Sequence, residues 1–319
     1  MEEEMIDSFS EAYTMNSGDG YCSYSKNSSI QKDAIFSAKE LITQTIVEKL
    51  DIKNFSFNIF RIADLGCSVG PNTFFAVQNI MEAVKSKQYY AAGVPGSFYN
   101  KLFPNSLLHI IHSSYSIHWI SKVPTEVVSK SSSAWNKGKI HYSSAPDAVT
   151  KAYAAQYQKD MDRFLCYRAQ EIVQGGLLVL IAPARPNGTS HSQTALNMCF
   201  DALGSCLLDM VNKGVVDEEK LDSFNIPIYV MSLEELAEAV DRNGYFTIEE
   251  IREQLPQSAK SDVILPWTTV SLLCRATLED PVKAHFGGEI VEELFDLYMK
   301  KLEELSSILR SGKAVDLLS

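Results

Sequence analysis

The sequence has little positive charge and lacks the marks of several protein classes. Its 319 residues include 29 Lys and Arg against 40 Asp and Glu, which gives a net charge of −11. Such a negative field repels nucleic-acid phosphates and acidic membrane surfaces, so it favours a small-molecule ligand. No apolar run approaches the ~18 residues of a membrane span, and the acidic residues 1–5 do not resemble a secretory signal. We expect a cytoplasmic protein that binds neither nucleic acid nor membrane.

The six cysteines are scattered, and no two of them form a C-x-x-C pair. This spacing is typical of free thiols in a reducing compartment rather than of a disulfide framework or a zinc site. The composition is otherwise ordinary for a globular protein, with 45% hydrophobic and 22% charged residues. The length fits one large α/β domain with an extra lobe, or two domains.

Strand and helix patterns alternate along the first part of the chain, which predicts a doubly wound parallel sheet. Strands are predicted at 60–63, 107–111 and 176–183, and helices at 32–50, from Pro71 onwards, and at 147–173, the last ending at Gly175 and Gly176. After Pro186 the pattern changes to helices at 193–214, 232–243 and 289–309, which predict a helical lobe over the ligand edge of the sheet.

The most informative segment is the glycine turn, Asp64-Leu65-Gly66-Cys67-Ser68-Val69-Gly70, which follows a predicted strand and precedes a helix. Glycines permit positive φ and let a ligand approach the backbone, and ligands bind at the carboxyl ends of parallel strands. A dinucleotide site favours G-x-G-x-x-G, whereas Ser68 occupies the position of the middle glycine. The turn therefore favours S-adenosylmethionine (SAM), with another nucleotide or a plain tight turn as the alternatives.

Several further motifs accompany this turn in a fixed order. They are Ser23-Tyr24-Ser25-Lys26-Asn27-Ser28, Gln31, Gly93-Val94-Pro95-Gly96-Ser97-Phe98-Tyr99, Leu102-Phe103-Pro104, His112-Ser113-Ser114-Tyr115-Ser116-Ile117-His118-Trp119, Asn136-Lys137-Gly138 and Asp222-Ser223-Phe224-Asn225-Ile226-Pro227. Together they resemble the plant SABATH methyltransferases, which methylate carboxylic acids and, in the caffeine pathway, xanthine nitrogens. The resemblance implies a homodimer with a Rossmann-like SAM-binding domain over 1–190, including an N-terminal substrate arm. Residues 191–319 would then form an α-helical cap and a C-terminal return to the sheet.

The resemblance also implies roles for individual residues. The cofactor contacts it implies, with Gly66 from the turn, are Tyr24, Gly66, Cys67, Asn72, Ser97 and Phe98. The substrate contacts it implies are Gln31, His118, Trp119, Phe200 and Tyr229. Some family members have a Mg²⁺ site at the positions of Asn136, Asp222, Phe224 and Asn225. The oxygen atoms of these residues suit Mg²⁺, but a loop held by its own side-chain hydrogen bonds explains the same residues.

The chemistry expected is methyl transfer from SAM to a small carboxylic acid by in-line displacement, which gives a methyl ester. A carboxylate, with a reference pKa of about 4, is already ionised and needs no general base. The Gln31 amide and the Trp119 indole N–H would hold it, while Tyr24 and Phe98 would face the sulfonium. The alternatives are N-methylation of a heterocycle such as a xanthine, and a binding protein for SAM or a small acid without turnover.

The sequence departs from the family pattern on the ribose side of the cofactor. Relatives carry an F-x-N-D-x-x-x-N-D-F stretch, with the Asp that binds the ribose hydroxyls, where this chain runs from Lys87 directly to Gln88. The N-terminal arm also has Asn16-Ser17-Gly18 where relatives often have Lys-Gly-Gly, the stretch at 257–260 is short, and the last strand is truncated after Ser319. Two interpretations are open: either the stretch is absent and half of the cofactor site is incomplete, or Lys87 and Gln88 are not adjacent in the natural chain.

Overall fold

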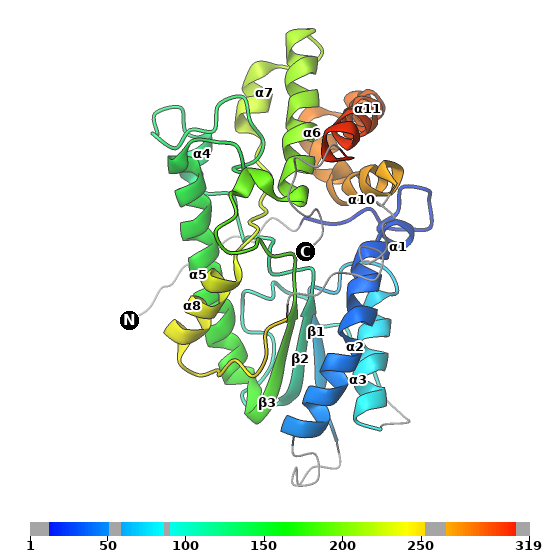
Figure 1. Ribbon diagram of the computed structural model, residues 1–319, viewed down its shortest axis with the longest axis vertical. Coiled ribbons are helices and arrows are strands. Elements are labelled where there is room, and N and C mark those ends of the chain that lie inside the picture. The colour runs from blue at the N-terminus through cyan, green and yellow to red at the C-terminus, as the bar shows by residue number, and fades with distance from the viewer. Residues whose placement is uncertain (1–12, 51–58, 86–89, 253–265, 311–319) are drawn as a thin grey trace.

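The computed structural model describes residues 13–50, 59–85, 90–252 and 266–310, with side chains through 305 (Figure 1). A parallel sheet flanked by helices forms one half of the molecule, and a helical cap forms the other. The Rossmann-like sheet with an α-helical cap is confirmed. Among the described residues, no helix is long and apolar enough to cross a membrane. All six cysteines are free thiols.

The sheet has three described strands in the order β1 (Ile62–Leu65), β2 (Leu108–Ser114) and β3 (Ile172–Ile181), all parallel. Since parallel strands end at one edge, the segments that follow β1 and β2 meet there. In register, Asp64 of β1 lies opposite His112 of β2.

The predicted end of the long helix was wrong. Helix α5 (Asp147–Glu171) passes directly into β3, and the two glycines lie inside that strand. Gly175 adopts φ +75°, in an irregular stretch where the register between β2 and β3 shifts. A Cβ at Gly176 would lie 2.9 Å from the carbonyl oxygen of His109. These glycines therefore allow β2 and β3 to approach closely, and they do not end the helix.

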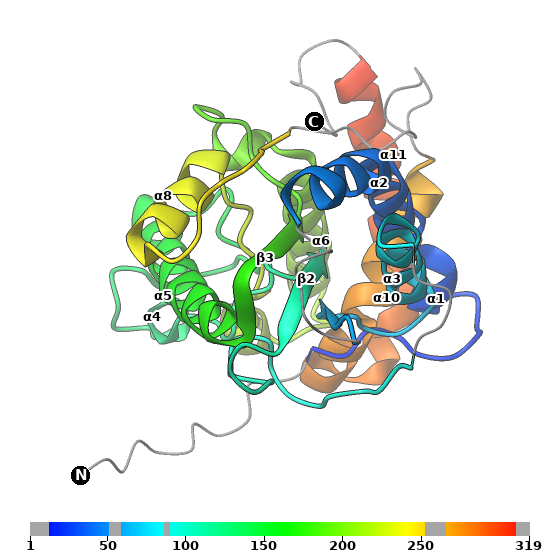
Figure 2. The same ribbon diagram turned by 90° about the horizontal axis from the view of Figure 1, so that it is seen from below.

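Two helices cover each face of the sheet (Figure 2). Helices α2 (Ser29–Lys49) and α3 (Asn72–Ala83) pack on one face, and α5 and α8 (Leu233–Asn243) pack on the other. The predicted helix at 232–243 therefore belongs to the sheet half, because α8 packs on α5. It begins with a capping box between Ser232 and Glu235 and ends at Gly244 with φ +70°.

The cap consists of α6 (Ala195–Asn212), α7 (Glu218–Ser223), α10 (Trp267–Phe286) and α11 (Val291–Arg310), which share a second hydrophobic core. The sequence pattern missed α10, since it contains Pro281 and starts with β-branched residues. The short helices α1 (Tyr24–Asn27) and α4 (Thr125–Val128) and the 3₁₀ turns His191–Gln193 and Gly288–Ile290 complete the described elements. Helix α1 contacts α10, and Asn16 N–H donates to the Ala276 carbonyl at 2.8 Å, so the N-terminal arm is fastened to the cap.

The packing of α2 on the sheet gives a stability prediction. Ile46 is fully buried among Ile42, Ile80 and Ile110, whereas its neighbour Val47 is 64% exposed. We expect Ile46→Ala to lower the free energy of unfolding by about 2–5 kcal/mol, because it leaves a cavity in a packed core. Val47→Ala, the matched control, should change it by less than about 0.5 kcal/mol. Urea denaturation followed by circular dichroism measures both, and equal effects would contradict the burial of this face of α2.

Candidate functional site

The glycine turn forms a tight cradle at the end of β1. Gly66 has φ +73° and Gly70 has φ +116°. A Cβ at Gly66 would lie 2.3 Å from Ser116 Oγ and 3.3 Å from the Phe98 ring. Ser116 Oγ in turn donates to the Gly66 carbonyl at 3.0 Å. Both the left-handed φ and this close approach require glycine at position 66.

The N-terminal arm packs against the same turn. A Cβ at Gly70 would lie 3.1 Å from Cα of Ser25, so α1 sits directly on the turn. Asn72 Nδ2 donates to Oγ of Ser28 at 3.0 Å and to its carbonyl at 3.2 Å, which ties α3 to the start of α2. Burial, and secondarily Tyr115, raises the pKa of Tyr24 to about 12, so its hydroxyl stays protonated. Three predicted cofactor residues, Tyr24, Cys67 and Asn72, thus border one space.

That space is a cavity of about 1970 Å³ between the sheet edge, the arm, α2 and the cap. A pocket for one small molecule usually measures about 300–1,000 Å³, so this cavity has room for two ligands side by side. It is lined by ten of the predicted residues, namely Tyr24, Gln31, Gly66, Cys67, Asn72, Ser97, Phe98, His118, Trp119 and Phe200. Residues from six separate parts of the sequence therefore converge on one site.

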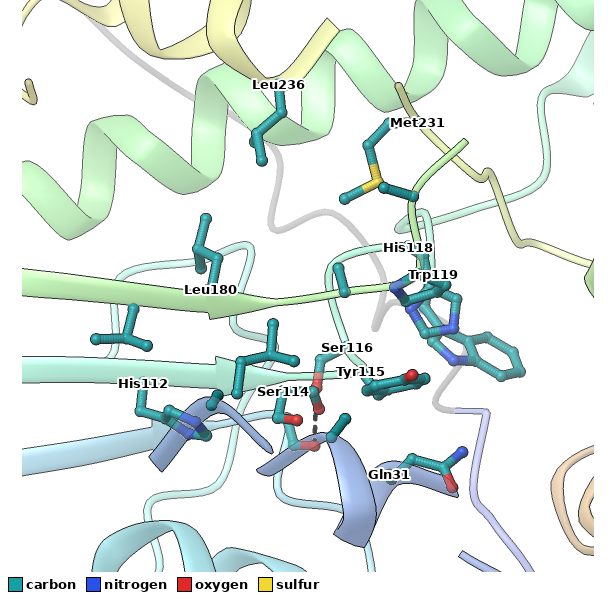
Figure 3. Close-up of a pocket in the computed structure, with 18 of the residues that line it drawn as sticks. Gln31, His112, Ser114, Tyr115, Ser116, His118, Trp119, Leu180, Met231 and Leu236 are labelled. Atoms are coloured by element: carbon teal, nitrogen blue, oxygen red, sulfur yellow. Dashed lines mark hydrogen bonds between the residues drawn. The ribbon is translucent and has the colours of Figure 1, made fainter. Parts of the chain in front are cut away.

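One end of the cavity carries polar and aromatic groups from two elements (Figure 3). Gln31 comes from the first turn of α2, and Tyr115, His118 and Trp119 come from the segment after β2. Gln31 Oε1 is buried and has no hydrogen-bond partner among the described residues. The Trp119 ring lies 5.8 Å from that of Tyr13 and 6.1 Å from that of His118.

Tyr115 is a cavity residue that the sequence reasoning missed. Its φ of +52° is uncommon for a bulky residue and turns the chain sharply after β2. Its ring meets that of His118 edge-on at 6.2 Å, and Figure 3 draws it between Gln31 and the His118–Trp119 pair. Burial raises its pKa to about 12. Tyr115 could have been predicted as a cavity residue, because it lies in the same motif as His118 and Trp119.

His118 is a neutral wall of this end of the cavity. The residue is 6% exposed, and burial lowers its pKa to about 3. Its Nδ1 has no hydrogen-bond partner among the residues that the structure describes. An imidazole with so low a pKa is a poor proton acceptor at neutral pH.

The structure places Tyr229 away from the cavity wall. Its hydroxyl donates to Oε1 of Glu235, and its ring packs 5.1 Å from those of Tyr142 and Tyr157. Its chain neighbours Ile228 and Val230 line the cavity instead. Tyr229 is thus not among the residues that line the cavity, and its contact with the substrate stays a prediction.

The residues implied for Mg²⁺ form a self-contained loop. Asn136 Nδ2 donates to Asn225 Oδ1 at 2.7 Å, and the Gly138 N–H donates to Asp222 Oδ1 at 2.8 Å. The Phe224 side chain packs in the cap core, 5.0 Å from Phe286. Within the described ranges, no three His, Cys, Asp or Glu side chains cluster as metal ligands. Asn225 Oδ1 and Asp222 Oδ1 thus accept N–H groups, whereas Asn136 Oδ1 is buried and has no partner among the described residues. Mg²⁺ at this loop stays a prediction, and we derive no step through a metal.

Comparisons with known proteins agree with this geometry. The sequence profile of the SAM dependent carboxyl methyltransferase family matches residues 10–88 and 83–317. The chain is 42% identical to loganic acid O-methyltransferase of Catharanthus roseus, over 92% of this chain and 89% of that protein. It is 36% identical to farnesoic acid carboxyl-O-methyltransferase of Arabidopsis thaliana, over 93% and 94%. A solved structure of loganic acid methyltransferase with SAH superposes with a TM-score of 0.87, at 40% identity, covering 91% of this chain and 92% of that one.

The family match also bears on the shortened region. Its two segments, 10–88 and 83–317, overlap at the Lys87–Gln88 junction, where the sequence departs from the family pattern. The alignment with the Catharanthus relative runs over 334 positions, more than all 319 residues of this chain. The relative therefore has residues that this chain lacks. Residues 86–89, like the short stretch at 257–260 and the C-terminal end, lie outside the described residues.

The remaining half of the cofactor site fits SAM. Gly66 and Gly70 both adopt a positive φ, which the G-x-x-x-G spacing permits, and Gly66 and Cys67 line the cavity. Burial, and secondarily Asp64, raises the pKa of the Cys67 thiol beside the turn. A protonated thiol at this place does not compete as a nucleophile for an activated methyl group.

The cradle predicts a sharp effect of one added methyl group. We expect Gly66→Ala to weaken binding of S-adenosylhomocysteine (SAH) more than about 100-fold, because the new Cβ collides with Ser116 and the φ is strained. Gly188→Ala is the matched control, since Gly188 has φ +75° and open space around it. Isothermal titration calorimetry should show wild-type affinity in this control. Wild-type affinity in Gly66→Ala would remove the turn from the cofactor site.

The buried imidazole predicts a pH dependence of stability. The unfolded chain protonates His118 below its reference pKa of about 6.5, whereas the folded chain does so only near 3. The free energy of unfolding therefore falls as pH drops below 6.5, and His118 contributes about 2 kcal/mol of that fall by pH 5. His118→Gln should lose correspondingly less stability between pH 7.5 and pH 5. Identical losses in the two proteins, measured by urea denaturation, would show that His118 titrates normally in the fold.

Proposed function

We propose, starting from the fact that this chain belongs to the SAM-dependent carboxyl methyltransferase family, that it converts a small organic acid to its methyl ester. The observation that carries the proposal is the convergence of Gln31 and Trp119 on the cavity beside the glycine cradle. Gln31 comes from α2 and Trp119 from the segment after β2, so only the folded chain brings the two side chains to one cavity.

The acceptor end suits a carboxylate. The Gln31 amide and the Trp119 indole supply neutral N–H donors, which orient a carboxylate without competing for the methyl group. A carboxylic acid with a pKa of about 4 is already ionised at neutral pH, and the neutral His118 therefore has no proton to remove. Catalysis in this site consists of positioning the acceptor oxygen and excluding water.

The cofactor end is proposed to use Tyr24, Gly66, Cys67, Asn72, Ser97 and Phe98. SAM, when bound, supplies a methyl group on a positively charged sulfur. The Phe98 ring lies beside Gly66, and Tyr24 interacts with Tyr115, so aromatic side chains border the end of the cavity where we propose that charge to sit. Aromatic faces attract cations, while the protonated hydroxyls and thiol do not react with them.

The body of the acceptor would lie against the cap. Leu196, Cys199 and Phe200 of α6 line the cavity, as do Ile228 and Val230. These apolar walls favour an acid whose body is largely hydrocarbon, such as a terpenoid, iridoid, fatty or aromatic acid. The relatives that act on loganic and farnesoic acid belong to the first two of these classes by name, and they support the choice of acid as acceptor.

N-methylation of a heterocycle and binding without turnover are the competing functions. A screen with methyl-labelled SAM, small carboxylic acids and xanthines separates them, with organic-extractable ester as the product counted. We expect ester from at least one acid and no methylated xanthine. Product from a xanthine alone would overturn the acceptor assignment, and SAH binding with no product from any compound would favour the binding protein.

The two donors predict matched kinetic defects. We expect Gln31→Ala and Trp119→Phe each to lower kcat/KM for the acid about 10–100-fold, or about 1.4–2.7 kcal/mol, since each change removes one N–H that orients the carboxylate. The affinity for SAH should stay near that of the wild type. Gln44→Ala is the matched control, because Gln44 lies exposed on the same helix and donates only to Glu48. Wild-type kinetics in both active-site variants would reject the donor pair.

A further inference from the structure

The loop that carries Ser97 and Phe98 has little support of its own. Residues 90–107 connect α3 to β2 without a helix or strand, and 90–96 are all exposed. Tyr99 is the one fully buried side chain in this loop. Its hydroxyl donates to the Trp119 carbonyl at 2.6 Å. The exact place of Phe98 must therefore be fixed from outside the loop.

A buried ion pair at the end of α5 does this. Arg168 and Glu171 are both fully buried, and Arg168 Nη2 lies 2.7 Å from Glu171 Oε2. Arg168 Nη1 donates to the Phe98 carbonyl at 2.6 Å, and Nη2 donates to the Asn100 carbonyl at 2.9 Å. The two charged groups thus reach the loop on the side of the cofactor residues.

Glu171 holds the following part of the same loop. Its Oε1 accepts the backbone N–H groups of Leu102 at 2.5 Å and Phe103 at 2.9 Å. The pair as a whole therefore makes four hydrogen bonds to loop backbone, two from the cation and two to the anion. Charge-assisted bonds of this kind are short and strongly directional.

Such a pair is costly as a means of stability alone. Two charges removed from water must recover their hydration, and apolar residues of equal volume often serve a core as well or better. What an apolar pair cannot do is bind both carbonyls and N–H groups of an irregular segment at fixed positions. Both charged groups form hydrogen bonds to the backbone of the loop around Phe98, and this geometry indicates a positioning role.

We propose that Arg168 and Glu171 are positioning residues for the cofactor, which set the Phe98 ring against the Gly66 cradle. The proposal rests on the proposed contact between Phe98 and SAM. Neither charge touches the cavity directly, since neither residue lines it. The pair acts through the Phe98 carbonyl, and the ring that this carbonyl positions lies 3.3 Å from the place of a Cβ on Gly66.

A double-mutant cycle on SAH binding tests this route. Arg168→Lys keeps the positive charge beside Glu171 but cannot reach both carbonyls, so SAH affinity should fall about tenfold. Phe98→Ala should also lower it about tenfold. If Arg168 acts through Phe98, the double variant should bind within about twofold of Phe98→Ala, whereas independent effects would multiply to about 100-fold. Titration calorimetry with the full chain gives all four affinities without any acceptor acid.

The control and the outcomes distinguish the positioning role of Arg168 from the cofactor contact of Phe98. Arg275→Lys makes the same substitution in an ion pair with Glu279 and Glu292 on α10 and α11 of the cap, and it should leave SAH affinity unchanged. Multiplicative losses in the cycle, or wild-type affinity in Arg168→Lys, would overturn the positioning role while leaving the proposed function intact. Wild-type affinity in Phe98→Ala would reject the cofactor contact itself, and with it the route from Arg168.

A second variant keeps the test decisive if Arg168→Lys does not fold. Glu171→Gln retains an oxygen that can accept the Leu102 and Phe103 N–H groups but removes the charge opposite Arg168. The same cycle with Phe98→Ala applies, again with a loss of SAH affinity in Glu171→Gln that disappears in the Phe98→Ala background. A loss that persists in that background would contradict the proposal.

Discussion

The close approach of Gly66 to Ser116 is the contact on which the rest of the site depends. It joins the end of β1 to the segment after β2, and it leaves no room for a side chain at position 66. Because Ser116 Oγ donates to the Gly66 carbonyl, the turn and the Tyr115–Trp119 segment hold a fixed relation. The proposed cofactor residues Cys67 and Asn72 follow the first of these segments and the proposed acceptor contacts His118 and Trp119 lie in the second, so this contact fixes how the two proposed subsites are placed.

The arm and α2 then enclose this edge of the sheet. Ser25 lies against Gly70, and the Asn72 amide binds Ser28, which begins the helix that carries Gln31. Gln31 thus reaches the cavity in a position determined by the same turn that forms the cradle. From the other side, Tyr99 binds the Trp119 carbonyl. Both proposed carboxylate donors are therefore linked by hydrogen-bonded contacts to the cofactor end, as a reaction controlled by position requires.

The sequence was sufficient for those features that depend on local pattern. The three strands, the glycine turn and ten of the cavity residues follow from apolar runs, glycine spacing and motif resemblance.

The sequence was insufficient where tertiary packing determines the structure. Gly175 and Gly176 resembled a helix end but serve an irregular strand, and the 20-residue helix α10 was hidden by Pro281. The Tyr229 hydroxyl donates a hydrogen bond to Glu235, and no sequence motif predicts this contact. Arg168 and Glu171 gave no signal, because buried charges look like exposed ones on a helix.

The missing ribose-binding stretch gives the Arg168–Glu171 pair added weight. Among the described residues, the sheet ends at β1 on the side away from β2. Residues 90–96, which lead to Ser97, are all exposed. Restraint then comes from downstream, where α5 binds the backbone on both sides of residue 101. A cofactor site that loses one anchoring contact depends more strongly on the rigidity of those that remain, because each unrestrained group must be ordered at the expense of binding energy.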